Sequence, residues 1–315
     1  MDDIEILEIP PLSPQESCLL DMHTLLNMMN VLRGELFLIG LNLAGKGDLL
    51  HRSLATCDEM VRSLSDAEGV QSTLRNHGQS IEIIQADIDS ALAAHPEKRS
   101  DPDLIESLGN LESVFAILRA RSCELIARLQ APGLWTAHSI PELRRSFMEI
   151  FSAIEKNSHG RYRLIYNVAL KKPLDYYIDF KIESYDGEIL WMPPVIQDVM
   201  RDLIANARKY TLPGGRITAA LYGGKDWLTL HVEDTGRGIP SRELARVIEY
   251  GRRGSNVGDV RTMGGGFGLT KAFVVTKQFG GRFWIASEVG VGTRIRIKIP
   301  RPPGLPPRLT SAPAH

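Results

Sequence analysis

The sequence lacks the features that mark several classes of protein. Its 315 residues hold three cysteines, Cys18, Cys57 and Cys123, which are too far apart for a metal-ligand spacing and indicate buried thiols in a reducing compartment. No apolar run approaches the roughly 20 residues that span a bilayer, and the acidic start MDDIEILEIP is unlike a signal peptide. A formal net charge of −1 gives no reason to expect a nucleic acid or an anionic membrane as partner. We therefore expect a cytoplasmic protein without a membrane span.

Proline is also absent between Glu16 and His95, a stretch rich in Leu, Met, Ile, Ala and charged residues. This composition predicts helices. We expect a first helix from about Ser17 to Leu43, ended by Ala44, Gly45, Lys46 and Gly47, with Asp48 as the cap of a second helix.

Apolar residues at alternating spacings of four and three recur as far as residue 130, with a polar break at residues 95–102. Only Ser122 departs from this spacing after the break. Residues 1–131 are therefore predicted to form an antiparallel helical bundle, which we expect to be dimeric.

The pattern changes after Pro132 and Gly133. Ser139 and Glu142 form a capping box for a helix that runs to about Glu155. Segments of β character follow, separated in places by helices, at residues 162–168, 176–182, 216–222, 227–232, 282–287 and 293–299. This alternation predicts an α/β sandwich with a mixed sheet over residues 138–300. The Pro-rich tail, residues 301–315, is expected to be disordered.

Three motifs in this second half point to a nucleotide. The first, Asp202 to Thr211, lies at the end of an amphipathic helix, where Asp202 and Asn206 leave the same face. A carboxylate and an amide oxygen are hard ligands suited to Mg²⁺, and Lys209 is close enough in sequence to offer charge to a phosphate.

The second motif, Glu233 to Ile239, follows an apolar strand directly. A carboxylate there can accept a hydrogen bond from an adenine amino group, and Gly236 and Gly238 let the backbone approach closely. The third motif, Gly264 to Leu269, leads into a helix, whose free N–H groups favour phosphates.

In this order and spacing the motifs resemble the histidine kinase ATPase family, the Bergerat-fold group shared with type II topoisomerases, a chaperone family and a mismatch-repair ATPase. Asp202 to Thr211 resembles its N box, Asp234 to Ile239 its first glycine box and Gly264 to Leu269 its second. Residues 280–285 and 290–293 resemble the family's C-terminal strands, so that the resemblance covers about residues 138–300.

The resemblance implies ATP and Mg²⁺ as cofactors, with Asn206 on the metal and Asp234 on adenine. It implies a mobile ATP lid over residues 239–263, in which Tyr250 stands at a loosely matched aromatic position and Arg252 or Arg253 reaches the γ-phosphate; a solvated basic loop is the alternative. The nucleotide-binding residues that it implies are Asn206, Lys209, Tyr210, Asp234, Gly236, Gly238, Ile239, Gly264, Gly265, Gly266, Phe267, Gly268, Leu269 and Thr293.

The candidate phosphoacceptor is His23. Leu25, Met28, Leu32, Leu36, Ile39 and Leu43 make an apolar stripe, and His23, Asn27, Asn30 and Gly34 fall on the opposite, accessible face. That face resembles the H box of the dimerisation and phosphotransfer domain of histidine kinases. The resemblance makes His23 the phosphorylated residue and gives Asn27 the role of positioning water in a phosphatase reaction. An ordinary solvated histidine is the alternative.

Two departures from the family pattern qualify this expectation. Thr24 stands where the family has an acid thought to be the general base, which predicts weak autokinase activity or a base supplied by Asp21 or Asp202. Asp202 stands where histidine kinases usually have Asn, as in hydrolytic relatives and the mitochondrial protein kinases of this fold.

We expect a histidine kinase that autophosphorylates His23 from Mg-ATP, with Asn27, Asp202 and Arg253 as further catalytic residues. A response regulator would accept the phosphoryl group, and input would come from a sensor protein in trans or from the helices beyond residue 75. The alternatives are a phosphotransfer or phosphatase protein with weak autokinase activity, and an ATPase or Ser/Thr protein kinase of the same fold.

Overall fold

The computed structural model divides into two compact units, residues 11–132 and residues 1–10 with 133–315. It describes residues 1–131, 133–156, 160–258 and 266–305. Each unit has its own cluster of buried apolar side chains and is described by itself.

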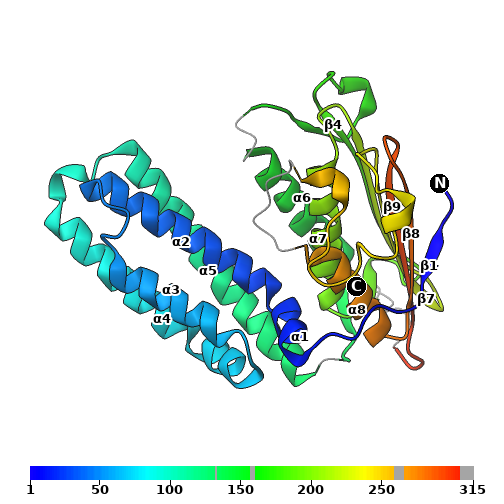
Figure 1. Cartoon of the computed structure of the whole chain (residues 1–315), viewed down its shortest axis with the longest axis horizontal. Coiled ribbons are helices and arrows are strands. Elements are labelled where there is room, and N and C mark those ends of the chain that lie inside the picture. The colour runs from blue at the N-terminus through cyan, green and yellow to red at the C-terminus, as the bar shows by residue number, and fades with distance from the viewer. Residues whose placement is uncertain (132, 157–159, 259–265, 306–315) are drawn as a thin grey trace, which may run out of the picture. The chain divides into compact units, whose positions relative to one another are not determined.

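The first unit is a bundle of helices. Its elements are α1 (Pro14–Asp21), α2 (His23–Ala44), α3 (His51–Ser63), α4 (Ala67–Ala94) and α5 (Pro102–Gln130). Helix α2 packs against both α3 and α5, and α4 packs against the same two helices. The four long helices therefore close a bundle within one chain (Figure 1). The helical sequence beyond residue 75, which we considered as a possible input element, forms α5 and most of α4.

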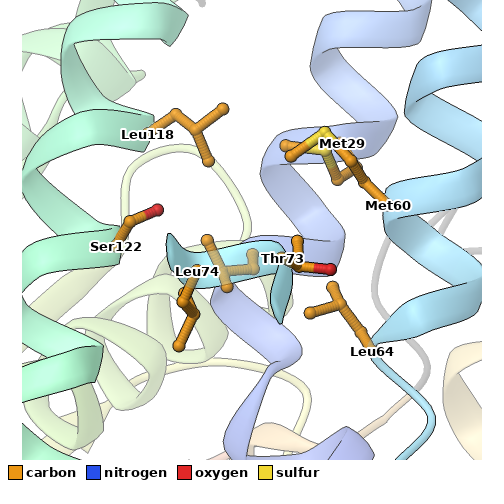
Figure 2. A pocket seen from close by; sticks show the side chains of 8 residues that line it. Met29, Met60, Leu64, Thr73, Leu74, Leu118 and Ser122 are labelled. Atoms are coloured by element: carbon orange, nitrogen blue, oxygen red, sulfur yellow. The ribbon is translucent and has the colours of Figure 1, made fainter. Parts of the chain in front are cut away.

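The predicted apolar stripe of α2 forms part of the core of this bundle, although Met28 lies at its margin. Within this core lies a small cavity of about 10 Å³, lined mainly by residues of α2, α3, α4 and α5 (Figure 2). Ser122, the residue that breaks the apolar spacing of α5, lines this cavity. Its buried hydroxyl has no hydrogen-bond partner in the part of the chain that the structure describes. A space of this size holds at most one water.

The ends of the first helices differ in part from the prediction. Helix α2 does end at Ala44, because Gly45 adopts a left-handed φ of 67° and its N–H caps the last turn. However, Leu50 and not Asp48 precedes α3, and no side chain caps that helix. The helix predicted from residue 17 is also broken, since α1 ends at Asp21 and α2 begins at His23 with a bend of 62°.

The second unit is built on a seven-stranded mixed sheet with strand order β1-β8-β9-β7-β6-β4-β3. The strands are β1 (Ile4–Ile6), β3 (Leu164–Ile165), β4 (Tyr176–Ser184), β6 (Arg216–Gly223), β7 (Trp227–Asp234), β8 (Arg282–Glu288) and β9 (Gly292–Pro300). Strand β4 runs parallel to β3 and β6, and the other pairs are antiparallel. A separate two-stranded sheet pairs β2 (Thr136–Ser139) with β5 (Ile189–Met192).

Three helices cover one face of the large sheet: α6 (Ile140–Lys156), α7 (Val195–Tyr210) and α8 (Gly268–Gln278) (Figure 1). Helix α6 begins where the capping box predicted, with the Glu142 N–H donating to Ser139 Oγ at 3.5 Å. Strands alternate buried and exposed side chains, so that one face of the sheet meets the helices in a shared core. The predicted α/β sandwich with a mixed sheet is confirmed.

The N-terminal ten residues belong to this second unit. The prediction of a helical bundle over residues 1–131 had included them wrongly. Strand β1 pairs with β8, and the Arg282 guanidinium donates to both carboxylate oxygens of Glu5. Strands β2 and β5 were not predicted, and the segment predicted over residues 162–168 is a strand only at Leu164 and Ile165.

The C-terminal tail begins directly after β9. Arg301 forms an ion pair with the buried Asp186 at 2.6 Å. The predicted disorder of the tail from residue 306 lies outside the described residues.

Among the described residues, no helix alone has the length and apolarity to cross a membrane; the bent pair Pro14–Asp21 and Leu25–Ala44 meets that test only when taken together.

Candidate nucleotide site and phosphoacceptor

Helix α7 carries four of the predicted site residues along its length. Its apolar face, including Val199, Leu203 and Ala207, is buried in the core of the second unit. Burial of that face leaves the polar positions free to form a site, in the order Asp202, Asn206, Lys209 and Tyr210.

Asp234, at the end of β7, lies next to the C-terminal end of α7. Its carboxylate accepts the Gly236 N–H at 2.8 Å, and its strand partner is Thr293 of β9. Burial raises the pKa of Asp234 from 3.8 to about 6, although hydrogen bonds from the backbone N–H groups of Gly236 and Thr293 act in the opposite direction. The result is a buried carboxyl group that can accept a hydrogen bond from an amino group of a ligand.

The first glycine box closes tightly around this carboxylate. Gly238 has a φ of 67°, and a Cβ on it would overlap the carbonyl oxygen of Glu288. The Arg237 N–H donates to the carbonyl oxygen of Tyr210 at 3.1 Å, and the Ile239 N–H donates to Ser287 Oγ at 2.8 Å. These bonds fix the loop after β7 against α7 and β8.

The second glycine box meets α7 further along. A Cβ on Gly268, the first residue of α8, would lie 2.8 Å from Asn206 Nδ2, so a larger residue there would displace the Asn206 amide. Gly266 has a φ of 83°, Phe267 precedes the first turn of α8, and Leu269 packs against the core. Gly264 and Gly265 lie outside the described residues. The structure thus brings Asn206 beside the N-terminus of α8, where backbone N–H groups favour anions.

Two cations of the predicted site are close enough to repel each other. Burial lowers the pKa of Lys209 from 10.5 to about 8, and the positive charge of Arg253 contributes to the shift. The Arg253 guanidinium itself donates to the Val257 carbonyl oxygen at 2.9 Å. A polyanion bound between the two cations would relieve their repulsion. The pair is therefore suited to binding a triphosphate.

The segment predicted as a lid contacts the second glycine box. The ring centroids of Tyr250 and Phe267 lie 4.7 Å apart. Thr270 Oγ1, just after the box, donates to the carbonyl oxygen of Glu249 at 3.2 Å. Tyr250 therefore occupies a packed position beside the glycine loop. Residues 259–263 of the predicted lid are outside the described part of the chain.

Sequence reasoning missed one member of the site. Lys271 of α8 is buried, and its Nζ lies 3.2 Å from Asp202 Oδ2. The available signal was a lysine among the buried residues Ala272, Phe273 and Val275 of a helix, because a fully buried lysine needs a charged partner.

The donor set fits a magnesium ion held together with a nucleotide. Among the described residues, no group of three or more His, Cys, Asp and Glu side chains forms a metal site by itself. Asn206 offers an amide oxygen beside the α8 N-terminus, and Mg²⁺ is commonly bound by few protein oxygens together with substrate phosphates.

In the helical unit, His23 is the first residue of α2, and its Nε2 lies 3.3 Å from Asn27 Nδ2. Asn30 and Gly34 are exposed, as predicted, and Asn27 is half-buried. His23 itself is only 8% exposed, so the expected accessible imidazole is wrong for this conformation. The prediction assumed one continuous helix, whereas the chain breaks at the buried residue Met22 and His23 begins a new helix. The Thr24 side chain is outside what the structure describes.

Comparison with known proteins identifies the nucleotide-site region. Residues 193–303 match the family described as "Histidine kinase-, DNA gyrase B-, and HSP90-like ATPase". The adaptive-response sensory kinase SasA of Synechococcus elongatus is 36% identical over 109 residues, 34% of this chain and 28% of its own. The sensor protein SrrB of Staphylococcus aureus is 32% identical over 129 residues, 40% of this chain and 21% of its own. The chain thus spans about a quarter of the length of these relatives.

Solved structures similar to this chain include histidine kinases. The catalytic domain of histidine kinase ThkA superposes with a TM-score of 0.39 and 19% identity, covering 54% of this chain and 99% of its own. The mycobacterial sensor histidine kinase MprB gives a TM-score of 0.37 and 20% identity, covering 53% and 97%. The order of motifs, the family match over residues 193–303 and the named relatives agree, and they confirm the resemblance to two-component sensor histidine kinases.

Proposed function

We propose that this chain is an ATP-dependent protein-histidine kinase that phosphorylates its own His23 and passes the phosphoryl group to an aspartate of a response regulator. One observation carries the proposal. A single helix, α7, links a buried carboxylate suited to adenine at Asp234 with a phosphate-binding end formed by Lys209, Arg253 and the α8 N-terminus.

Different residues of the chain bind the adenine, the phosphates and the metal ion. Asp234 accepts the adenine amino group, and the N–H groups at the start of α8, with Lys209 and Arg253, hold the phosphates. When bound at Asn206, Mg²⁺ supplies positive charge to the phosphates. Catalysis in this scheme is positioning and charge neutralisation.

The transfer step needs a nucleophilic nitrogen on His23. With the Asn27 amide donating, Nε2 of His23 carries a lone pair. Its bond to the γ-phosphorus forms as the bond from that phosphorus to the ADP oxygen breaks, and Nδ1 then releases its proton. The N-terminus of α2 favours the negative phosphoryl group that results. In the second step, the N–P bond breaks as a receiver carboxylate takes the phosphoryl group.

A partner surface is available on α2. Val31, Phe37, Leu38 and Leu41 are large apolar side chains that stay exposed on this helix. An apolar stripe of this kind is a surface that a second protein covers. We assign it to a homodimer, which sedimentation of the wild type and Leu38→Asp would test; a wild type that remains monomeric at micromolar concentration would contradict the assignment.

The proposed function is tested by incubating the purified chain with radiolabelled ATP and Mg²⁺. We expect acid-labile, alkali-stable label on the wild type, and none on His23→Gln or Asn206→Ala. Matched controls are His51→Gln, an exposed histidine at the start of α3, and Asn76→Ala, an exposed asparagine of α4. Both controls should label as the wild type does.

The outcomes separate the alternatives. Acid-stable label would indicate a Ser/Thr protein kinase, and multiple-turnover phosphate release without label would indicate an ATPase. Failure to bind a fluorescent ATP analogue would reject a nucleotide-dependent activity altogether.

A further inference from the structure

Lys271 is a buried lysine that neither of the predicted glycine boxes includes. It is 2% exposed, and its Nζ lies 3.2 Å from Oδ2 of Asp202, whose side chain is 22% exposed. The two residues are 69 positions apart in sequence and join α8 to α7. An ammonium group buried to this degree requires a close anionic partner, so Asp202 is held as one half of an ion pair.

This ion pair lies at the phosphate end of the site. Gly268 stands one helical turn before Lys271, and a Cβ on it would lie 2.8 Å from Asn206 Nδ2 and 3.7 Å from Asp202 Cβ. Asp202 is therefore beside both the amide assigned to the metal and the helix N-terminus assigned to phosphates. A carboxylate in this place could accept a proton from a water molecule that attacks the γ-phosphate.

We propose that Lys271 is a positioning residue that determines which acceptor receives the phosphoryl group. By holding Asp202 in an ion pair, Lys271 keeps this carboxylate from accepting a proton from an attacking water molecule. Transfer to histidine is thereby favoured over hydrolysis. The inference rests on the proposed kinase function. It explains how a kinase could carry an acid at position 202, where histidine kinases usually have Asn.

The two competing reactions differ in their need for a base. In hydrolysis, a water oxygen bonds to the γ-phosphorus, the bond to the ADP oxygen breaks, and the water proton passes to Asp202 and then to solvent. In transfer to histidine, a neutral imidazole nitrogen attacks with its own lone pair and needs no base in the same step. Removing the cation at position 271 therefore assists only hydrolysis.

The test compares Lys271→Met with Lys271→Arg, both made with His23→Gln so that every transferred phosphoryl group goes to water. We expect Lys271→Met to raise the rate of phosphate release by about a hundredfold, the lower end of what a general base contributes. The Arg variant keeps the charge and should show no rise. Adding Asp202→Asn to Lys271→Met should cancel the increase.

A second readout separates this role from a structural one. Binding of a fluorescent ATP analogue should change by less than about threefold in Lys271→Met, because the change acts on kcat and not on nucleotide affinity. If Lys271→Met does not fold, as judged by its thermal midpoint, Lys271→Gln takes its place. Unchanged phosphate release with intact nucleotide binding would overturn the proposal, and so would a rise that persists with Asp202→Asn. Neither result depends on the phosphohistidine assay, whose failure in the wild type would instead reject the kinase function.

Discussion

The amide nitrogen of Asn27 lies 3.3 Å from Nε2 of His23, one helical turn away at the start of α2. This contact occupies the lone pair that would attack ATP, so it must break before His23 is phosphorylated. We therefore predict that Asn27→Ala keeps autophosphorylation or raises it by up to about fivefold, the equivalent of one ordinary hydrogen bond.

The same variant should dephosphorylate a phosphorylated receiver domain at least about tenfold more slowly, because Asn27 would position the attacking water. Asn76→Ala, an exposed asparagine of α4, is the control and should leave both rates unchanged. Equal loss of both activities in Asn27→Ala would contradict this division of roles.

Asp234→Asn is predicted to stabilise the protein while abolishing nucleotide binding. Burial raises the pKa of this carboxyl from 3.8 to about 6, so the folded state holds its proton where the unfolded chain has released it. The free energy of unfolding therefore falls as pH rises between about 4 and 6, and the cost persists above that window. Removing the charge should recover up to about 3 kcal/mol at pH 7, measured by urea unfolding without nucleotide. A less stable variant at pH 7 would contradict the burial argument.

ATP affinity should decline in alkaline solution because of Lys209. Its pKa is lowered to about 8 by burial and by the charge of Arg253, and bound phosphates would raise it again. Binding then takes up a proton above pH 8, and affinity should fall by up to about tenfold per pH unit there. Calorimetric titration between pH 7 and 9 measures this slope. Lys209→Arg keeps its charge throughout and should flatten it; a wild type with no slope would contradict the placement of phosphate at Lys209.

Two glycines with the same φ of 67° separate backbone strain from steric overlap. A Cβ on Gly238 would overlap the Glu288 carbonyl, whereas one on Gly251 meets nothing within 4 Å. We predict that Gly251→Ala costs about 1 kcal/mol of unfolding free energy, the usual cost of a left-handed residue. Gly238→Ala should cost clearly more and reduce ATP binding. Equal losses in thermal unfolding of the two variants would show that overlap at Glu288 is unimportant.

The N-terminal strand is predicted to stabilise the ATPase unit. Ile6 is 4% exposed and belongs to that unit's core, whereas Ile4 on the same strand is 44% exposed. Ile6→Ala should cost about 2–5 kcal/mol, as truncations of buried isoleucine do, and Ile4→Ala should cost little. Denaturant unfolding followed by tryptophan fluorescence, to which Trp284 on the neighbouring strand β8 contributes, measures both. A small effect at Ile6 would place β1 outside the folded core.

The glycine boxes and α7 were predictable because each leaves a signal in its own residues. Close approach and a positive φ at Gly238 exclude a side chain, so glycine itself is visible in the sequence. The 3.6-residue period of α7 likewise shows which face is buried. Such signals can be recognised before the distant residue that imposes them, such as Glu288, is known.

The features that sequence analysis missed depend on distant residues. Strand β1 is three residues long and pairs with residues 283–285, so nothing near it indicates a strand. The partner of Lys271 is on another helix. The break at Met22 interrupts a segment whose composition favours one continuous helix, and His23, directly after it, is buried. Tertiary packing overrides local propensity at each of these positions.

Phosphorylation of His23 can be located directly by mass spectrometry. The wild type is incubated with Mg-ATP, digested at alkaline pH to preserve phosphohistidine, and fragmented by electron transfer. We expect a phosphorylated peptide that contains His23, with the added mass on the imidazole and absent from Asn206→Ala. Phosphate found only on a serine, a threonine or a different histidine would contradict it.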